Sequence, residues 1–194
     1  IIISKIFRKA KFTILGDVNQ NINPFYKYEK LSDLEKYFSG EDRYLELNKT
    51  YRSSPEIIDY TNKILGLNHV NAIRDKSNIP VTSRRNVDNL EELLIEDISE
   101  LTSKYYRVAI ITKDFIEAKK VYKYVKDKFP ISIIDEDTIK FHKNLVVIPA
   151  FLAKGLEFDA VIAYNNRENS YKKDERNLLY VACTRAQHKL VIYN

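Results

Sequence analysis

Short apolar runs rich in Val and Ile alternate along this chain with longer segments whose apolar residues recur at helical spacing. The runs predict buried strands, and a spacing such as Leu94, Ile98 and Leu101 predicts a helix. We expect strands at residues 12–15, 44–47, 108–112, 131–134, 145–148, 160–164 and 189–193, and helices at 53–66, 88–104, 115–129 and 175–184. This order predicts an α/β domain with a mainly parallel sheet, whose ligands bind in the loops after the strands.

The composition excludes several classes of protein. The chain has 194 residues, 44% hydrophobic and 30% charged, which suits one globular domain, or one domain with part of another. The single cysteine, Cys183, rules out an internal disulfide and is expected in the core, and the three histidines form no zinc-ligand cluster with it. No apolar run approaches the roughly 18 residues of a membrane span. We therefore expect a cytoplasmic protein with neither a metal site of its own nor a membrane partner.

The charge and the first residues add two expectations. The net charge of +5 favours anionic partners such as nucleotides or nucleic acid, although a Lys-rich solvated surface gives the same value. The sequence contains no Met and begins with three isoleucines, so we expect a fragment of a longer protein.

The glycines exclude the common nucleotide-binding loops. The chain has four of them, Gly16, Gly40, Gly66 and Gly155, and no two are close enough for the dinucleotide fingerprint or the P-loop. A G-x-S-x-G nucleophile elbow is also absent, which disfavours acyl transfer. If the domain handles a nucleotide, the loop that cradles the phosphates is not its own.

Two polar segments follow the first two predicted strands. Asp17 and Gln20 come after the first, where a glutamine can orient a water or bind a terminal phosphate, although such residues also form ordinary turns. Tyr51 and Arg52 come between the second strand and a capped helix. Tyrosine offers a face for base stacking and arginine a fork for phosphate oxygens; the alternative is a half-buried Tyr beside a surface Arg.

Two further segments lie near the C-terminal end of the sequence. Gly155 permits close approach of the backbone, and Glu157 can accept a hydrogen bond from a ribose hydroxyl, with a plain loop as the alternative. Arg185 follows the last predicted helix, where it either presents its guanidinium to a ligand or only complements the helix C-terminus.

Taken together and in this order, the four segments resemble motifs III, IV, V and VI of superfamily 1 helicases of the UvrD/Rep type. The strings that carry the resemblance are GDVNQNI, NKTYRS, AKGLEFDAV and LLYVACTRA, and it extends over residues 12–193. It implies a RecA-like fold without the P-loop. Residues 1–40 would be the end of the first RecA-like domain with its connector, and residues 41–194 the second RecA-like domain.

The resemblance also implies ATP as the nucleotide, with Mg²⁺ and the P-loop held by the first RecA-like domain. It implies catalytic roles toward the γ-phosphate for Gln20, Arg52 and Arg185, the last as an arginine finger. The nucleotide contacts that it implies are Tyr51 on the adenine and Glu157 with Gly155 on the ribose side, with Lys154 and Asp17 beside them. This chain alone is then expected to be inactive.

The sequence departs from the UvrD pattern where the family grips single-stranded DNA. Pro149 and Phe151 stand where Thr and His are usual, and neither side chain offers a polar contact. After motif III, the aromatic and basic residues Phe25, Tyr26 and Lys27 are the remaining candidates for contact with the strand.

These departures leave three hypotheses. The first is a DNA helicase or translocase acting on single-stranded or duplex DNA. The second follows from the strings VIPAFLAKGLEFDAV and LLYVACTRA, which resemble the HelD branch, whose members use ATP to release bacterial RNA polymerase from nucleic acid. The third is a non-enzymatic RecA-like interaction module, which the presence of Gln20, Arg52 and Arg185 disfavours.

Overall fold

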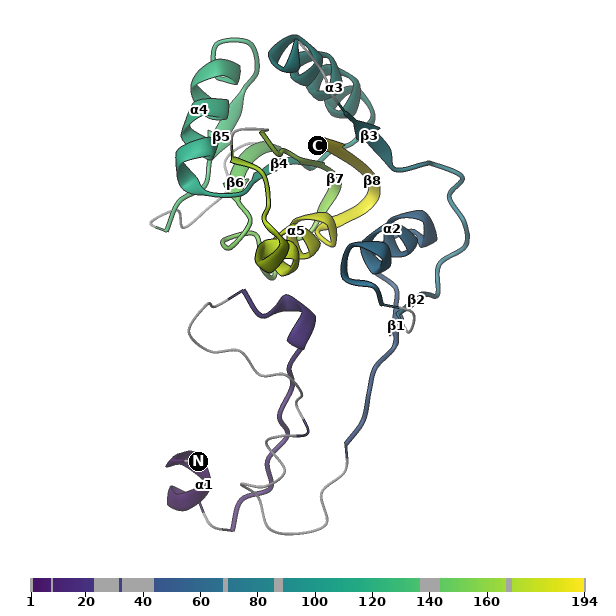
Figure 1. Ribbon diagram of the computed structural model, residues 1–194, viewed down its shortest axis with the longest axis vertical. Coiled ribbons are helices and arrows are strands. Elements are labelled where there is room, and N and C mark those ends of the chain that lie inside the picture. Colours follow the sequence, from purple (N-terminus) through teal and green to yellow (C-terminus); the bar gives the residue numbers. More distant parts are fainter. Residues whose placement is uncertain are drawn as a thin grey trace. The chain divides into compact units, whose positions relative to one another are not determined.

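A computed structural model describes residues 2–7, 9–22, 32, 44–67, 70–85, 89–136, 144–166 and 169–193 (Figure 1). The chain divides into two compact units, Ile1–Leu47 and Asn48–Asn194. The second unit contains both sheets and the helices that cover them.

The second unit is built on a six-stranded sheet in the order β3-β8-β7-β4-β6-β5. All of its neighbouring strands pair in parallel, which confirms the predicted α/β fold. Its strands are β3 (Thr82–Arg84), β4 (Val108–Thr112), β5 (Ile131–Ile133), β6 (Leu145–Pro149), β7 (Phe158–Ala163) and β8 (Ala186–Tyr193). A separate parallel pair joins β1 (Lys49–Thr50) to β2 (Asn71–Ala72).

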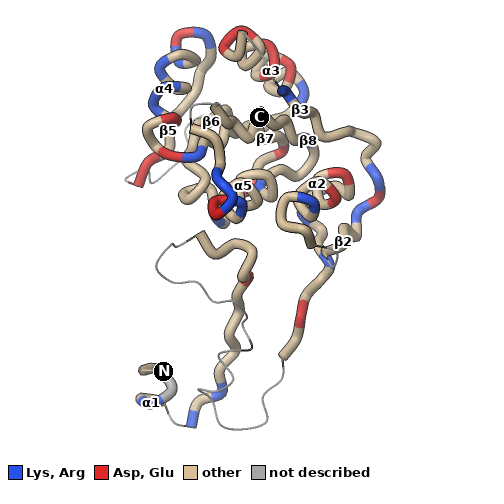
Figure 2. The backbone as a smooth tube through the Cα atoms, viewed as in Figure 1, with Lys and Arg blue, Asp and Glu red and all other residues tan. Residues whose placement is uncertain are grey.

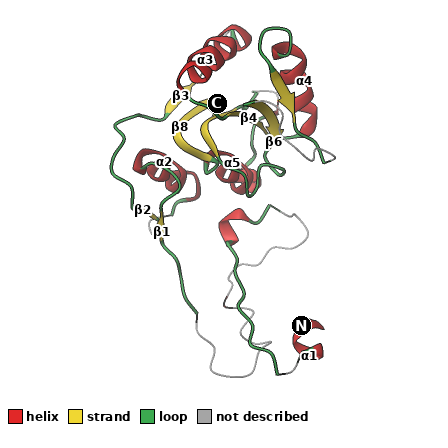
Figure 3. Cartoon of the chain, turned by 180° about the vertical axis from the view of Figure 1, so that it is seen from behind, coloured by secondary structure: helices red, strands yellow, loops and turns green. Residues whose placement is uncertain are grey.

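Helices cover both faces of the six-stranded sheet (Figure 3). The helices are α2 (Pro55–Leu65), α3 (Leu90–Lys104), α4 (Phe115–Val125) and α5 (Arg176–Cys183), the last preceded by the short 3-10 helix η4 (Lys173–Glu175). One core cluster packs α2 and α5 against the sheet and includes Cys183, and the other packs α3 and α4. Ile110 and Ile111 belong to different clusters because successive side chains of a strand point to opposite faces.

The ends of α2 follow from local sequence. Ser54 is the N-cap, Pro55 is the first helical residue and Glu56 adds an acid to the first turn, where the helix dipole favours negative charge. Gly66 ends the helix in the left-handed conformation, at a φ of 69°, which a residue with a Cβ adopts only with strain.

Two predicted strands are wrong. Residues 12–15 and 44–47 form no strand, and Leu15 and Leu47 are 86% and 87% exposed. An apolar run becomes a strand only where a neighbour pairs with its backbone, and such pairing begins at Lys49 opposite Asn71. The polar stretch 69–87 contributes β2 and β3, which its composition did not indicate, and α4 ends at Val125, four residues earlier than expected.

The described residues of the first unit include α1 (Ile2–Ile6) and the 3-10 turn η1 (Val18–Gln20). Asp17 caps this turn by accepting a hydrogen bond from the backbone N–H of Asn19 at 2.9 Å. In the described residues of both units, we find no helix long and apolar enough to cross a membrane.

The charged residues are distributed over many elements. Figure 2 shows Lys and Arg on α4, before α5 and between β2 and β3, while α3 carries mainly acidic residues. Within the described ranges, the positive net charge is therefore not concentrated on one helix, and charge alone does not locate a binding site.

Candidate functional site

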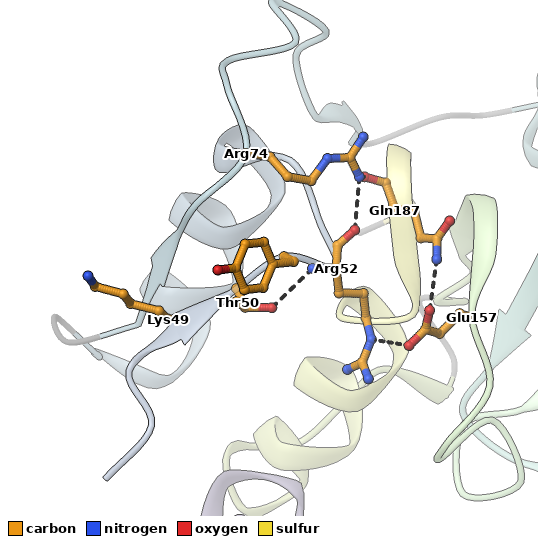
Figure 4. Close-up of a pocket in the computed structure, with 7 residues that line it drawn as sticks. Lys49, Thr50, Arg52, Arg74, Glu157 and Gln187 are labelled. Carbon is orange, nitrogen blue, oxygen red and sulfur yellow. Dashed lines mark hydrogen bonds and ion pairs between the residues drawn. The ribbon is translucent and has the colours of Figure 1, made fainter.

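An open pocket of about 500 Å³ brings together residues from distant parts of the second unit (Figure 4). Seven residues line it: Lys49, Thr50, Tyr51, Arg52, Arg74, Glu157 and Gln187. Tyr51, Arg52 and Glu157 are the three members of this set that the sequence analysis singled out as nucleotide-binding or catalytic residues.

The pocket lies at the amino ends of β7 and β8, because Glu157 directly precedes β7 and Gln187 is the second residue of β8. Tyr51 and Arg52, by contrast, directly follow β1, as expected of site residues in loops after strands. The chain leaves β6 at its carboxyl end and must return to the opposite edge of the sheet, since β7 runs parallel to β6 with β4 between them. This return loop, residues 150–157, brings Glu157 to the amino edge.

Gly155 lies in the return loop with a φ of 90°, a conformation that favours glycine. No atom lies within 4 Å of the position that a Cβ would occupy, so backbone conformation and not crowding explains the glycine. Neither Gly155 nor its neighbour Lys154 is among the residues that line the pocket.

Glu157 is held by two partners, one at each carboxylate oxygen. Arg52 Nε donates to Oε1 at 2.5 Å, and Gln187 Nε2 donates to Oε2 at 2.8 Å (Figure 4). Burial alone would raise the pKa of Glu157, but the hydrogen bond and charge of Arg52, together with the Gln187 bond, keep it below its ordinary value. Glu157 is therefore ionised at neutral pH.

Backbone and side-chain bonds join the start of α2 to the start of β8. Buried Ser53 donates from its hydroxyl to the carbonyl oxygen of Ala186 at 2.6 Å. The N–H of Ser54 donates to the carbonyl oxygen of Gln187 at 3.0 Å. These bonds fix Arg52, the residue before Ser53, against the strand that carries Gln187.

Sequence reasoning missed Arg74 and Gln187. Gln187 follows the TRA string by one residue and could have been found by extending that motif. Arg74 lies in the stretch without periodicity, and no local signal distinguishes it from the other basic residues there. Only the fold brings it to the pocket, which it lines together with Lys49, Arg52 and Glu157.

Tyr51 is 73% exposed at this pocket, although sequence reasoning left a half-buried tyrosine as the alternative. An exposed ring offers a free face to a planar ligand. An aromatic face beside three cations and one carboxylate suits a ligand with a planar base and anionic groups.

Arg185 lies behind the pocket and does not line it. It is 1% exposed, and its guanidinium donates to the carbonyl oxygens of Val181 at 3.1 Å and Leu156 at 3.3 Å, and to the Thr184 hydroxyl at 3.1 Å. Its charge also lowers the pKa of Glu157, so the two groups interact electrostatically.

The remaining candidates belong to the first unit. Asp17 accepts a hydrogen bond from the Gln20 side chain at 2.6 Å, so these two predicted site residues contact each other. Phe25, Tyr26 and Lys27 lie outside the described residues. Over the ranges that the structure describes, no group of three or more His, Cys, Asp or Glu is arranged to hold a metal ion.

The profile of the UvrD-like helicase C-terminal domain family matches residues 144–193, which include the return loop, α5 and β8. The solved C-terminal domain of a possible DNA helicase from Lactobacillus plantarum WCFS1 is 33% identical with a TM-score of 0.60, covering 74% of this chain and 86% of that one.

The helicase domain of Hef from Pyrococcus furiosus is 20% identical with a TM-score of 0.38, covering 54% of this chain and 24% of that one. No curated protein matches the sequence. The parallel sheet, covered by helices on both faces, and the match to a solved helicase domain define a helicase-type RecA-like domain. The chain belongs to the UvrD-like helicase C-terminal domain family.

Proposed function

We propose that this domain supplies one half of an ATP site and works with a P-loop domain as an ATP-dependent DNA helicase or translocase. The observation that carries the proposal is the convergence of Tyr51, Arg52 and Glu157 on one pocket, although Arg52 and Glu157 are 105 residues apart in sequence.

Each of these side chains has a role that suits its surroundings. The exposed ring of Tyr51 stacks on the adenine, and the ionised Glu157 accepts a hydrogen bond from a ribose hydroxyl. Arg52 retains donors beyond the one bonded to Glu157, because a guanidinium carries five N–H groups. Its remaining donors bind the terminal phosphate. Gly155 and Lys154 serve the nucleotide less directly, through the conformation and charge of the return loop.

Arg185 acts in this proposal as the arginine finger on the transferring phosphoryl group. It lies between α5 and β8, two regular elements that hold its backbone in place, and its charge lowers the pKa of Glu157. To reach a phosphate, the guanidinium must leave the carbonyl oxygens of Val181 and Leu156. A negatively charged phosphate is a stronger acceptor than either carbonyl, so nucleotide binding favours this movement.

The P-loop domain supplies what this domain lacks, namely the phosphate cradle and the Mg²⁺ ligands. Gln20 and Asp17 belong to that half of the site in the proposal, with Gln20 contacting the γ-phosphate. Splitting the catalytic groups between two domains makes hydrolysis depend on domain closure, and repeated closure and opening move the protein along nucleic acid.

The test is ATP turnover by the helicase that contains this domain, with Arg52→Ala compared with Arg107→Ala as a matched control. Arg107 is an exposed arginine that does not line the pocket. Arg52→Ala is expected to lower kcat by about a hundredfold or more, within the range of arginines that contact the transferring phosphoryl group. Equal turnover by the two variants would overturn the proposal.

A second candidate function is an ATPase that acts on RNA polymerase, as in the HelD branch. The observation that favours it is the apolar character of the chain where β6 meets the return loop: Pro149, the last residue of β6, is buried, and Phe151 in the loop is 41% exposed. An exposed phenylalanine suits a protein partner better than a sugar-phosphate backbone. Turnover stimulated by single-stranded DNA alone would support the helicase, whereas stimulation by RNA polymerase without a DNA response would support the second candidate.

A further inference from the structure

Arg74 lies in the stretch between β2 and β3 and contacts two other segments of the pocket, the one at Arg52 and the start of β8. Its Nη1 donates to the carbonyl oxygen of Arg52 at 2.9 Å and to that of Gln187 at 3.3 Å. Its Nη2 contacts Nδ1 of His188 at 3.0 Å. Figure 4 shows the Arg74 guanidinium beside Gln187 and the main chain of Arg52.

In the contact between Arg74 and His188, only Arg74 can be the hydrogen-bond donor. A guanidinium has donors and no acceptor, so Nδ1 of His188 must accept the hydrogen bond and carry no proton. His188 is the residue after Gln187, and Arg74 is therefore bonded to two consecutive residues of β8 as well as to Arg52. The flat, rigid fork of arginine suits such a set of acceptors, whereas a lysine ammonium is a single flexible point.

We propose that Arg74 is a positioning residue that holds Arg52 in the orientation needed to reach the terminal phosphate. This inference rests on the proposed function, because it gives Arg74 its effect through Arg52. Arg74 bonds the backbone of Arg52, and the Arg52 side chain bonds Glu157, which Gln187 also holds. Without Arg74, the backbone of Arg52 loses its bond to a guanidinium that is also bonded to β8, and the Arg52 side chain samples several orientations.

The first test uses the 194-residue chain and does not depend on catalysis. The Nε–H proton of Arg52 is bonded to Glu157 in the wild-type protein, so its NMR signal is expected to be resolved and slow to exchange with water. In Arg74→Ala and Arg74→Lys the signal is expected to broaden or to be lost. Lys76→Ala is the matched control, because Lys76 is an exposed cation of the same segment that does not line the pocket. An unchanged Arg52 signal in both Arg74 variants would overturn the inference.

The second test is a double-mutant cycle on ATP turnover by the helicase that contains this domain. Arg74→Ala is expected to lower kcat by about ten- to a hundredfold with little change in KM, as a small misplacement of a catalytic group does. Combined with Arg52→Ala, it should add almost nothing, because both substitutions remove the same interaction. Arg74→Lys is measured beside it, with thermal unfolding, so that a loss of turnover without a loss of folded protein remains visible.

The outcomes separate this inference from the proposed function. If Arg52→Ala leaves turnover unchanged, the proposed function fails and the inference fails with it. If Arg52→Ala lowers turnover but Arg74→Ala does not, or if the two effects multiply in the double variant, only the role of Arg74 is refuted.

Discussion

At the scale of single residues, Glu117 is a buried acid whose pKa lies well above its ordinary value. It lies in the first turn of α4 and is 3% exposed. Its backbone N–H donates to the N-cap Asp114, and its Oε2 is buried without a hydrogen-bond partner in the part of the chain that the structure describes. Burial raises the pKa of Glu117 from 4.5 to about 7.

This raised pKa predicts a stability that falls as pH rises. Between pH 4.5 and about 7 the folded chain retains a proton that the unfolded chain has lost, so unfolding becomes easier with increasing pH. The shift corresponds to about 3 kcal/mol in the free energy of unfolding. Urea unfolding at several pH values should show this fall in the wild-type protein and not in Glu117→Gln. The exposed Glu100→Gln is the control and should keep the wild-type slope; a Glu117→Gln slope equal to it would contradict the prediction.

Arg185 combines a buried position with a catalytic role in the proposal. Arg185→Lys keeps the charge but cannot bond Val181, Leu156 and Thr184 together. We expect turnover by the containing helicase to fall by about a hundredfold or more, while nucleotide affinity stays near that of the wild-type protein. Steady-state turnover and equilibrium binding of a fluorescent ATP analogue measure the two quantities. Unchanged turnover would refute the role of Arg185 as an arginine finger. A parallel loss of nucleotide binding and turnover would assign Arg185 a structural role only.

At the scale of elements, the join between α2 and β8 holds Arg52 in place. Ser53 is fully buried and donates to the carbonyl oxygen of Ala186, so Ser53→Ala removes one hydrogen bond and leaves that oxygen without this donor. The expected cost is about 1–2 kcal/mol in the free energy of unfolding. Thermal or urea unfolding checks it against Ser103→Ala, whose hydroxyl bonds a helix carbonyl at the surface and whose loss should cost little. Equal stability of the two variants would show that the join is not held by this bond.

Elements were predictable from sequence where hydrophobic periodicity decides them. β4 was predicted residue for residue, because an apolar run signals a buried strand within a few residues of sequence. α2 was predicted with its caps, because Ser, Pro and Glu at its start and Gly at its end are local signals of a helix. The strands expected at 12–15 and 44–47 fail for the opposite reason. A strand needs a partner, and local sequence does not say which segment provides it.

In the candidate site too, residues in local motifs were predictable, and residues placed by distant contacts were not. Tyr51, Arg52 and Glu157 stand in recognisable strings, and the structure brings them to one pocket. Arg74 could not be found from its neighbours, since its three contacts are to residues 22, 113 and 114 positions away. The position of the pocket at the amino edge was also missed, because it depends on the order of β6, β4 and β7 in the sheet.

At the scale of the whole molecule, the proposed function assigns one half of a nucleotide site to the pocket at Arg52, and the 194 residues contain no P-loop sequence. Without a phosphate cradle and the Mg²⁺ ligands of a partner domain, phosphoryl transfer lacks most of its charge stabilisation. The isolated chain should therefore hydrolyse ATP no faster than a buffer blank in a phosphate-release assay. Steady turnover by the purified chain, retained after a further purification step and abolished by Arg52→Ala, would contradict the two-domain account.

In the proposed site, ATP binds with its base against Tyr51. Photolabelling tests it most directly, with an azido-adenine ATP analogue added to the helicase that contains this domain, followed by peptide mapping. We expect label on the peptide that includes Tyr51, prevented by excess ATP and absent from Tyr51→Ala. Labelling that excess ATP prevents, but that falls only on other segments and persists in Tyr51→Ala, would contradict the claim.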